Sequence, residues 1–418
     1  MSDLHEVRIG DHISFLSGYP FSSEYFDQQE GIRLIRIRDL LQSEAKTYYR
    51  GPFDSRWLVK PQDVLIGMDG DFNAVRWRGD VALLNQRILK AEPRSDGAID
   101  LGFFYYWCGP FLDQIHNQTA ATTVKHLSIR DIEKARGLFP ERPVQRRIGE
   151  ILSTLDEAIE QTEALIAKYQ QIKAGLMRDL FARGLAPDGS LRPASESQHT
   201  TFGWIPRTWH VGSLLDVSDR SRQPILTGPF GADLGNDDFI AEGVPVLRIG
   251  NIQQGYLDLS DLLFVTPQKA RDLDRYRVCE GDLLFARQGA TTGRNALASK
   301  AVKHYLINYH IIRVALDQSR CSPVFIEAAF QGEIVKTQIA REKGRGTREG
   351  INTAQLKALE FPLAPLQEQR LIASVLRSQV SLIDEANRNV EKLRMLKNGL
   401  MRDLLTGCVR VDIEESTA

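Results

Sequence analysis

One six-residue sequence occurs twice in this chain and constrains the fold more than any other feature. GLMRDL stands at 175–180 and again at 399–404. The match extends backwards at a fixed offset, with identical residues at pairs such as Ile148/Ile372 and Lys173/Lys397. A fixed offset held over 146–180 and 370–404 indicates an internal duplication.

Both copies carry the periodicity of a helix that packs along a partner helix, because apolar positions step alternately by four and three residues. In the first copy these pairing positions are Ile148, Leu152, Leu155, Ile159, Thr162, Ile166, Tyr169, Lys173, Leu176 and Leu180. In the second copy they are Ile372, Leu376, Gln379, Ile383, Ala386, Val390, Leu393, Lys397, Leu400 and Leu404. Neither copy contains proline, so each predicts one continuous helix about 50 Å long.

Two polar or small residues recur within the predicted helices. Lys173 and Lys397 occupy matching pairing positions, where they either fix the register of the helices or extend to solvent. Gly175 and Gly399 lower helix stability by about 1 kcal/mol each relative to alanine. Their reuse predicts a close approach between helices.

Composition limits the classes of protein to consider. The 418 residues suffice for more than one domain, and a net charge of −1 means that a nucleic-acid partner would have to bind local basic patches. The four cysteines show no metal or redox spacing, and no apolar run is long enough to span a bilayer. We therefore expect a soluble cytoplasmic protein.

Globular segments precede both predicted helices. Short strand-like runs at 32–40, 63–70 and 81–90 predict a mixed sheet, and the aromatic run 103–107 is read as core in preference to a base-stacking platform. The globular segment before the second predicted helix repeats the order of features found before the first. Its residues 239–252 resemble 27–40, and its residues 280–295 resemble 60–76.

The predicted fold class is therefore mixed α/β, with two globular domains of similar fold, each followed by a long helix. The predicted divisions are a first domain at 1–140, a helix at 141–183, a Pro/Gly/Ser/Thr-rich linker at 184–206, a second domain at 207–364, a second helix at 365–407 and a tail at 408–418.

Recognition of DNA would use loops that carry basic and amide side chains. In the second domain the candidates are Arg248, Arg287, Gln288, Thr291, Thr292, Arg294, Asn295, Lys343, Arg345, Thr347 and Arg348. In the first domain they are Arg36, Arg38, Asp69, Asn73, Arg76, Thr122 and Lys125. The strongest basic cluster is KTQIAREKGRGTR at 336–348, for which the alternative is a solvated loop. Asp69 and Asp71 either accept from cytosine or cap a turn.

Catalytic motifs are missing from the sequence. The loop 286–295 lacks the Lys-Ser/Thr of a phosphate-binding loop, and His304 and His310 lack partners at metal-ligand spacing. Structural roles for these histidines are favoured, and a binding protein is favoured over an enzyme.

Together these patterns resemble the specificity subunit of type I DNA restriction-modification systems. The most specific words are IGEILSTLDEAIEQTEALIAKYQQIKAGLMRDL at 148–180, PLQEQRLIASVL at 365–376, GWIPRTWHVGSL at 203–214 and VLIGMDGDF at 64–72. The first copy departs from the pattern in its shorter PVQRRI at 143–148.

The resemblance implies that the helices pair antiparallel, that each domain reads half of a bipartite double-stranded DNA target, and that two modification (methyltransferase) subunits dock on the helices. It places S-adenosylmethionine on those partners, with Mg²⁺ and ATP on restriction subunits where these join, and no cofactor or metal on this chain. Lys173, Arg178, Lys397 and Arg402 are the expected partner-binding residues.

Two other classes of protein remain open from the sequence. A coiled-coil scaffold could join two protein-binding domains without contacting DNA, and co-purification with a methyltransferase together with a gel shift would distinguish it. A self-contained nuclease is disfavoured by the lack of a carboxylate and metal motif.

Overall fold

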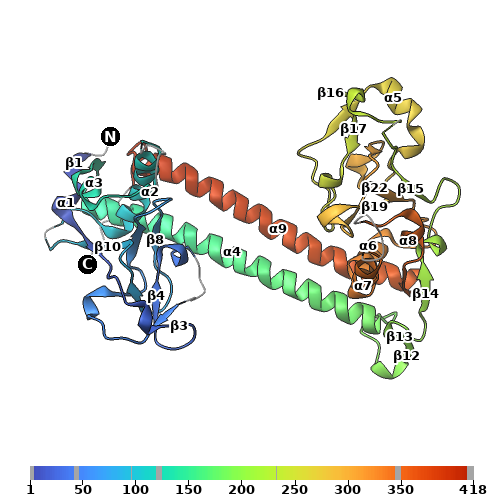
Figure 1. The fold of residues 1–418 in the computed structure, drawn as a ribbon, viewed down its shortest axis with the longest axis horizontal. Coiled ribbons are helices and arrows are strands. Elements are labelled where there is room, and N and C mark those ends of the chain that lie inside the picture. Colours follow the sequence, from blue (N-terminus) through green and yellow to red (C-terminus); the bar gives the residue numbers. More distant parts are fainter. Residues whose placement is uncertain are drawn as a thin grey trace. The chain divides into compact units, whose positions relative to one another are not determined.

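The computed structural model describes residues 4–41, 47–95, 97–118, 125–231, 233–343 and 350–411. The chain divides into two compact units. The first unit combines Met1–Ala164 with Asn387–Ala418, and the second is Leu165–Ala386. Because the long helices α4 (Arg142–Arg183) and α9 (Leu366–Leu405) are continuous, each contributes one part to both units (Figure 1).

The described strands of the first unit form two sheets and a two-stranded ribbon. One antiparallel sheet has the order β2 (Ile13–Ser17), β10 (Ile88–Pro93), β7 (Val64–Gly67) and β8 (Ala74–Arg76). The other has the order β3 (Phe26–Asp27), β5 (Tyr48–Tyr49), β4 (Ile32–Ile35), β9 (Ala82–Leu84) and β6 (Leu58–Val59), with β4 and β9 parallel. The ribbon pairs β1 (His5–Arg8) with β11 (Arg136–Phe139).

Three helices besides α4 and α9 lie in this unit, within its described residues: α1 (Ile9–His12), α2 (Leu101–Gln118) and α3 (Ile129–Lys134). The aromatic run 103–107 lies on α2, where Phe103 and Phe104 are fully buried against Ile148 and Leu152 of α4. The interpretation of this run as core is therefore confirmed.

The second unit repeats this topology. Its sheets have the orders β15 (Ile225–Thr227), β22 (Ile311–Val314), β19 (Leu283–Ala286), β20 (Asn295–Leu297), and β16 (Phe239–Ile240), β18 (Leu263–Val265), β17 (Val244–Leu247), β21 (Leu306–Ile307). As in the first unit, one pair in the second sheet is parallel, here β17 with β21. A ribbon joins β14 (His210–Ser213) to β23 (Glu360–Leu363), and the helices are α5 (Pro267–Asp272), α6 (Pro323–Gln331), α7 (Glu333–Lys343) and α8 (Thr353–Lys357).

Equivalent glycines mark the duplication at the level of single contacts. The amides of Gly18 and Gly228 donate to the carbonyls of Ile88 and Ile311 at 3.0 and 3.1 Å. A Cβ atom at either glycine would collide with backbone atoms of the neighbouring strand connection. The two globular domains therefore share one fold, as the order of features in the sequence predicted.

The long helices pair through the positions that the sequence predicts. On α4, Thr162, Ile166, Tyr169 and Lys173 are less exposed than their sequence neighbours, and on α9 Ala386 and Val390 are buried. Within the first unit, Asp156 of α4 pairs with Lys397 and Glu163 pairs with Arg394, both at 2.6 Å. Since a higher number on α4 faces a lower number on α9, the helices are antiparallel.

The prediction that Gly175 and Gly399 mark close helix approach is wrong. A Cβ atom added at either glycine would meet nothing within 4 Å. Both glycines therefore face open space, and the helices approach each other through larger residues instead.

A buried glutamine anchors the first turn of each long helix to its own unit. Gln145 and Gln369 are both 1% exposed. Gln145 donates to the Pro140 carbonyl at 2.8 Å and accepts from the Asp100 amide at 2.9 Å, directly before α2. Gln369 likewise donates to the Ala364 carbonyl at 2.8 Å and accepts from the Ser322 amide at 2.9 Å, directly before α6.

The segment 184–206, expected to be a linker, is folded. It contains the hairpin of β12 (Ser197–Thr200) and β13 (Gly203–Pro206), and Leu185 and Ile205 are buried in the core of the second unit. Glu368 at the start of α9 accepts from the Leu185 amide at 2.8 Å and pairs with Arg192 at 3.2 Å. A few well-placed apolar and charged residues thus order a segment whose composition is typical of linkers.

Candidate nucleic-acid interface

In the second unit, the loop after β19 is joined to two segments that are distant in sequence. The Arg287 guanidinium donates to the carbonyls of Tyr309 and Ile351 at 3.1 and 3.3 Å. Gln288 forms an isolated β-bridge with Gly350, and Lys343 at the end of α7 reaches the Gly289 carbonyl at 3.4 Å. The predicted loop 286–295 and the last residues of α7 therefore lie on one surface.

Aromatic rings lie next to this loop. The rings of Tyr309 and His310 have centroids 3.7 Å apart, and the Phe230 ring lies 6.1 Å from that of Tyr309. Phe230 is 59% exposed and Tyr309 is 38% exposed, so their faces are accessible. Exposed rings beside basic and amide groups can stack on bases while the polar groups bind phosphate or base edges.

His310 is bonded to Gln288 within this surface, and its surroundings favour the neutral ring. Its Nδ1 atom lies 2.5 Å from Oε1 of Gln288. Burial lowers the pKa of His310, and the nearby charge of Arg287 lowers it further. Because the Gln288 amide oxygen can only accept, Nδ1 carries the proton of the neutral ring and Nε2 is left as an acceptor, while the Gln288 NH2 group remains as a donor; the pair together can read base edges.

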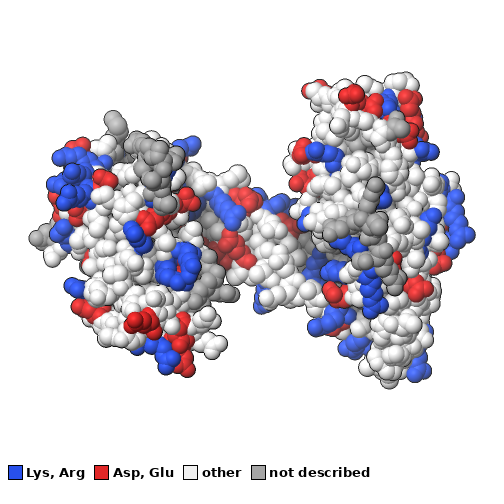
Figure 2. All heavy atoms as spheres, in the orientation of Figure 1, with Lys and Arg blue, Asp and Glu red and all other residues white. Residues whose placement is uncertain are grey.

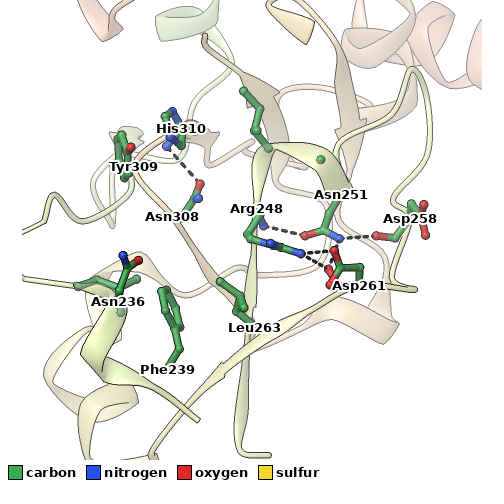
Figure 3. A pocket seen from close by; sticks show the side chains of 13 residues that line it. Asn236, Phe239, Arg248, Asn251, Asp258, Asp261, Leu263, Asn308, Tyr309 and His310 are labelled. Carbon is green, nitrogen blue, oxygen red and sulfur yellow. Dashed lines mark hydrogen bonds and ion pairs between the residues drawn. The ribbon is translucent and has the colours of Figure 1, made fainter. Parts of the chain in front are cut away.

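A cavity of about 560 Å³ adjoins the aromatic rings (Figure 3). Tyr309, His310 and Asn308 lie on one side, and Arg248 extends from the opposite side towards Asp261. Asn251 is buried in the wall of the cavity and donates to the carbonyls of Asp258 and Asp261 at 2.7 and 2.9 Å. The Arg248 guanidinium pairs with Asp261, a carboxylate whose side chain is 81% exposed. This cavity thus combines apolar walls with exposed polar groups.

Basic side chains gather near α7, the helix whose last residue contacts the loop 286–295. On the face drawn in Figure 2, Lys and Arg side chains gather over the region of α7, the helix that carries Lys336, Arg341 and Lys343. A local positive patch on a chain of net charge −1 is the electrostatic feature that phosphate binding requires.

The first unit places an equivalent loop against an equivalent segment. Asp69 forms a β-bridge with His126, as Gln288 does with Gly350. The Asp69 carboxylate lies 2.7 Å from Nδ1 of His126 and 3.4 Å from Arg87. Lys125 donates to the His116 carbonyl at 2.5 Å. The topology of this surface is shared with the second unit, but its side chains differ, because an aspartate and a histidine stand where the second unit has Gln288 and Gly350.

The paired carboxylates of this first loop differ in surroundings. Asp71 is 86% exposed and lies 3.6 Å from His116, and its carbonyl accepts from both the amide and the side chain of Asn73. The Asp69 carboxylate instead contacts His126 and Arg87. The turn at Asp71 is therefore closed by its backbone carbonyl, and the choice between cytosine contact and turn capping stays a prediction for both carboxylates.

Several predicted contact residues lie elsewhere or are buried. Arg76 donates to Ser153 of α4 at 3.0 Å and lies over the rings of Tyr105 and Tyr106, so it packs against α2 and α4 instead of lining the loop. Asn295 is fully buried and its amide donates to the Gly293 carbonyl, so it shapes the loop from inside. Residue type alone did not predict that Arg76 packs against α2 and α4 or that Asn295 is buried.

Other predicted residues keep a surface position or a loop position. Arg36 pairs at 3.2 Å with the buried Asp39, whereas the Arg38 side chain is 66% exposed. Thr291 and Thr292 donate to backbone carbonyls within their own loop, and Arg294 donates to Gln253 at 2.8 Å. Thr122, Arg345, Thr347 and Arg348 lie outside the described residues.

Each of the two GLMRDL segments, 175–180 and 399–404, exposes one arginine to solvent. The side chains of Arg178 and Arg402 are 81% and 79% exposed, and each lies beside the following aspartate. Lys397 is instead held at 2.6 Å from Asp156, and Lys173 lines a cavity beneath α6. The register-fixing reading therefore fits Lys397, whose side chain is only 22% exposed.

Phe230, Tyr309, His310 and Asn308 were not predicted as members of this surface. His310 had been assigned a structural role, and the other three carried no motif. The available signal was the sequence NYH directly after the apolar pair of β21, because such residues at the end of a buried strand often face a ligand.

Among the residues that the structure describes, no group of three or more His, Cys, Asp or Glu side chains is arranged to hold a metal ion. Within the same residues, none of the helices has the length and apolar character required to cross a bilayer.

Two copies of one α/β fold, each with a polar loop surface and both sharing a pair of long helices, define a tandem recognition protein. The chain belongs to the family of the type I restriction modification DNA specificity domain, whose model matches residues 1–171 and 206–392. Membership implies recognition of a DNA target.

Curated relatives agree over nearly the whole chain. The specificity subunit of type I restriction enzyme EcoBI from Escherichia coli is 28% identical over 95% of this chain and 83% of its own length. The MjaVIII specificity subunit from Methanocaldococcus jannaschii is 23% identical over 98% of this chain and 93% of its own.

Solved structures share the fold. The S subunit of a type I restriction-modification system from M. genitalium superposes with a TM-score of 0.64 at 14% identity, covering 99% of this chain and 97% of that one. A chain from a structural study of type I complex assembly and conformational transition gives a TM-score of 0.52 at 15% identity, covering 97% and 98%.

Proposed function

We propose that this chain reads a bipartite double-stranded DNA target, one half with each unit, and directs a type I complex to methylate adenine or restrict DNA there. The observation that carries this proposal is the repeated loop surface on two copies of one fold. The first copy offers Asp69 and His126, whereas the second offers Arg287, Gln288 and His310. Identical scaffolds with different polar groups suit two different half-sites.

Within each unit, recognition combines two kinds of contact. Lys343 and the other basic residues near α7 bind phosphates, which sets position and salt dependence. Gln288, His310 and the groups around the cavity read base edges, with Tyr309 and Phe230 supplying apolar contact. In the first unit, Asp69 and the exposed Arg38 take the corresponding roles.

The chemistry belongs to partner subunits. Two modification subunits carrying S-adenosylmethionine bind the two copies of the helix repeat and flip the target adenine out of the duplex. Restriction subunits supply ATP- and Mg²⁺-dependent cleavage where they join the complex. The complex acts on DNA in the cytoplasm, and this chain contributes specificity without a catalytic step.

The repeated GLMRDL segments support such docking. Gly175 and Gly399 face open space, and the exposed Arg178 and Arg402 lie one helical turn further on. An open glycine beside an exposed arginine leaves room for a partner backbone and offers it a cation. Two similar surfaces of this kind suit two copies of one partner.

The test is to map methylated adenines in cells that express the chain with its modification subunit. Gln288→Ala should relax sequence choice in one half of the target only, because one mismatched contact typically changes discrimination by about 1–3 kcal/mol. Lys343→Ala should weaken DNA binding evenly across sequences and lower the salt slope by about 1. Lys269→Ala, on α5 of the same unit and paired with Asp238 at 3.0 Å, is the matched charge control.

Relaxation of both halves by Gln288→Ala, or of neither, contradicts the assignment of one half-site to each unit. Assembly with modification subunits but no gel shift on target DNA would favour a scaffold that joins proteins without reading DNA.

A further inference from the structure

A cavity of about 360 Å³ lies in the second unit between α6 and the adjoining parts of α4 and α9. Its wall includes Lys173 and Met177 of α4, Glu327 and Ala328 of α6, and Val380 of α9. The loop 254–256, with the 61% exposed Tyr256, forms part of its rim. The proposed reading of DNA makes no use of this cavity.

The duplication identifies what occupies the equivalent place in the first unit. The anchoring glutamines bond to the residues directly before α2 and α6, which aligns Asp100 with Ser322. In this alignment Phe103 matches Phe325, and both are fully buried. Tyr106 then matches Ala328, and the helix repeat matches Asp156 with Val380.

In the first unit a tyrosine ring fills this position. The Tyr106 hydroxyl donates to Asp156 at 2.7 Å, and the Lys397 ammonium lies 5.5 Å from the ring centroid. Lys397 also pairs with Asp156 at 2.6 Å. One phenol ring therefore joins α2 to both long helices through a hydroxyl, a carboxylate and an ammonium group.

The second unit keeps the lysine and lacks the ring. Lys173 matches Lys397, but alanine replaces Tyr106 and valine replaces Asp156. The cavity is therefore the space that a large aromatic side chain would otherwise take. Its volume is ample for one ring, since an apolar cavity of about 150 Å³ accommodates benzene.

The cavity also offers a group that can bond to a phenol hydroxyl. Oε1 of Glu327 accepts from the Leu297 amide at 3.1 Å, and the carboxyl is partly buried beside α4. A carboxyl group can accept a further hydrogen bond from a hydroxyl. Glu327 thus can take the place that Asp156 holds in the first unit.

From this comparison we infer that the cavity receives an aromatic side chain, a tyrosine by its chemistry, from the modification subunit that docks on the second unit. The inference rests on the proposed function. It makes the two docking surfaces unequal: the first unit contains its own ring, and the second takes one from its partner. Docking at the second unit then depends on a buried aromatic anchor.

The first experiment measures the binding of 4-methylphenol, the tyrosine side chain, to the full chain by saturation-transfer NMR. The wild-type chain should give a signal that Ala328→Tyr abolishes, because the new ring fills the cavity. Ala167→Tyr, at an exposed position of α4, should retain it. No signal from the wild type, or an equal signal from Ala328→Tyr, overturns the inference.

The second experiment measures assembly with the modification subunit by native mass spectrometry. Ala328→Tyr should weaken the binding of one of the two subunits by about 30-fold, as the loss of a buried aromatic anchor does. If misfolding is suspected, Ala328→Tyr combined with Val380→Asp rebuilds the tyrosine–aspartate pair of the first unit and should fold while still blocking one subunit.

The two experiments separate the inference from the proposed function. Unchanged binding of two subunits by both variants overturns the inference and leaves the proposed function standing. A wild-type chain that binds 4-methylphenol but no modification subunit overturns both the proposed function and the identity of the partner.

Discussion

Glu327→Gln should remove a pH-dependent loss of stability from the second unit. Burial raises the pKa of Glu327 from 4.5 to about 7, although the Leu297 amide and the Lys173 ammonium act in the opposite direction. Because the folded pKa exceeds the unfolded one, the native state binds more protons between these values, and stability falls as pH rises from 4.5 to 7. Glutamine keeps the carbonyl that accepts from Leu297 and cannot ionise.

The magnitude follows from the difference between the two pKa values. At about 1.4 kcal/mol per pKa unit, ionisation of Glu327 lowers the free energy of unfolding by roughly 3 kcal/mol at pH 8. Part of this loss, about 1 kcal/mol, is already present at pH 5. The advantage of Glu327→Gln over the wild type should therefore grow by about 2–3 kcal/mol between pH 5 and pH 8.

Urea unfolding at a series of pH values tests this prediction, with the transition of the second unit followed separately because two units can unfold in two steps. The control is Glu333→Gln, on the neighbouring helix, whose carboxylate is 87% exposed and should show little pH dependence relative to wild type. An advantage of Glu327→Gln that stays constant from pH 5 to pH 8 would refute the reasoning.

Three further perturbations test other parts of the fold and its surfaces. Gln369→Leu removes two buried backbone partners at the start of α9 and should destabilise the second unit by about 2–4 kcal/mol in urea unfolding, whereas Gln171→Leu at an exposed site should change stability by less than about 0.5 kcal/mol. Asp282→Asn leaves the half-buried Arg222 without its buried counter-ion and should cost about 3–5 kcal/mol in the same assay. Arg178→Ala together with Arg402→Ala should reduce the number of modification subunits bound in native mass spectrometry while the pattern of methylated adenines on surviving complexes stays unchanged.

The helices were predictable because their signal is local. A side chain four or three residues away on a helix always lies on the same face, so Ile166, Tyr169 and Ala386 could be assigned to the pairing face from spacing alone. The duplicated topology was predictable for a related reason, since the order of Gly, Asp and apolar runs survives after identity has been lost.

The candidate interface could be predicted only in part because it is assembled from distant segments. Gln288 lies next to His310 and Gly350 through strand pairing, and no periodicity reports that proximity. Position was equally hidden, since Asn295 has the residue type of a DNA contact and yet is fully buried, and Arg76 packs against α2 and α4. The fold of 184–206 depended on a few apolar residues, among them Leu185, Leu191 and Ile205, in a segment that is mostly polar.

The matched glutamines at the start of α4 and α9 have a consequence for the evolution of such proteins. Gln145 and Gln369 make the same pair of bonds to backbone groups, so each unit is joined to its helix in a manner that does not depend on the side chains of its recognition loops. Substitutions in the loops that follow β7 and β19 therefore leave the joint between each domain and its long helix intact, because the partners of both glutamines are backbone groups. The two domains can thus diverge in their loops while both helices stay attached in the same way.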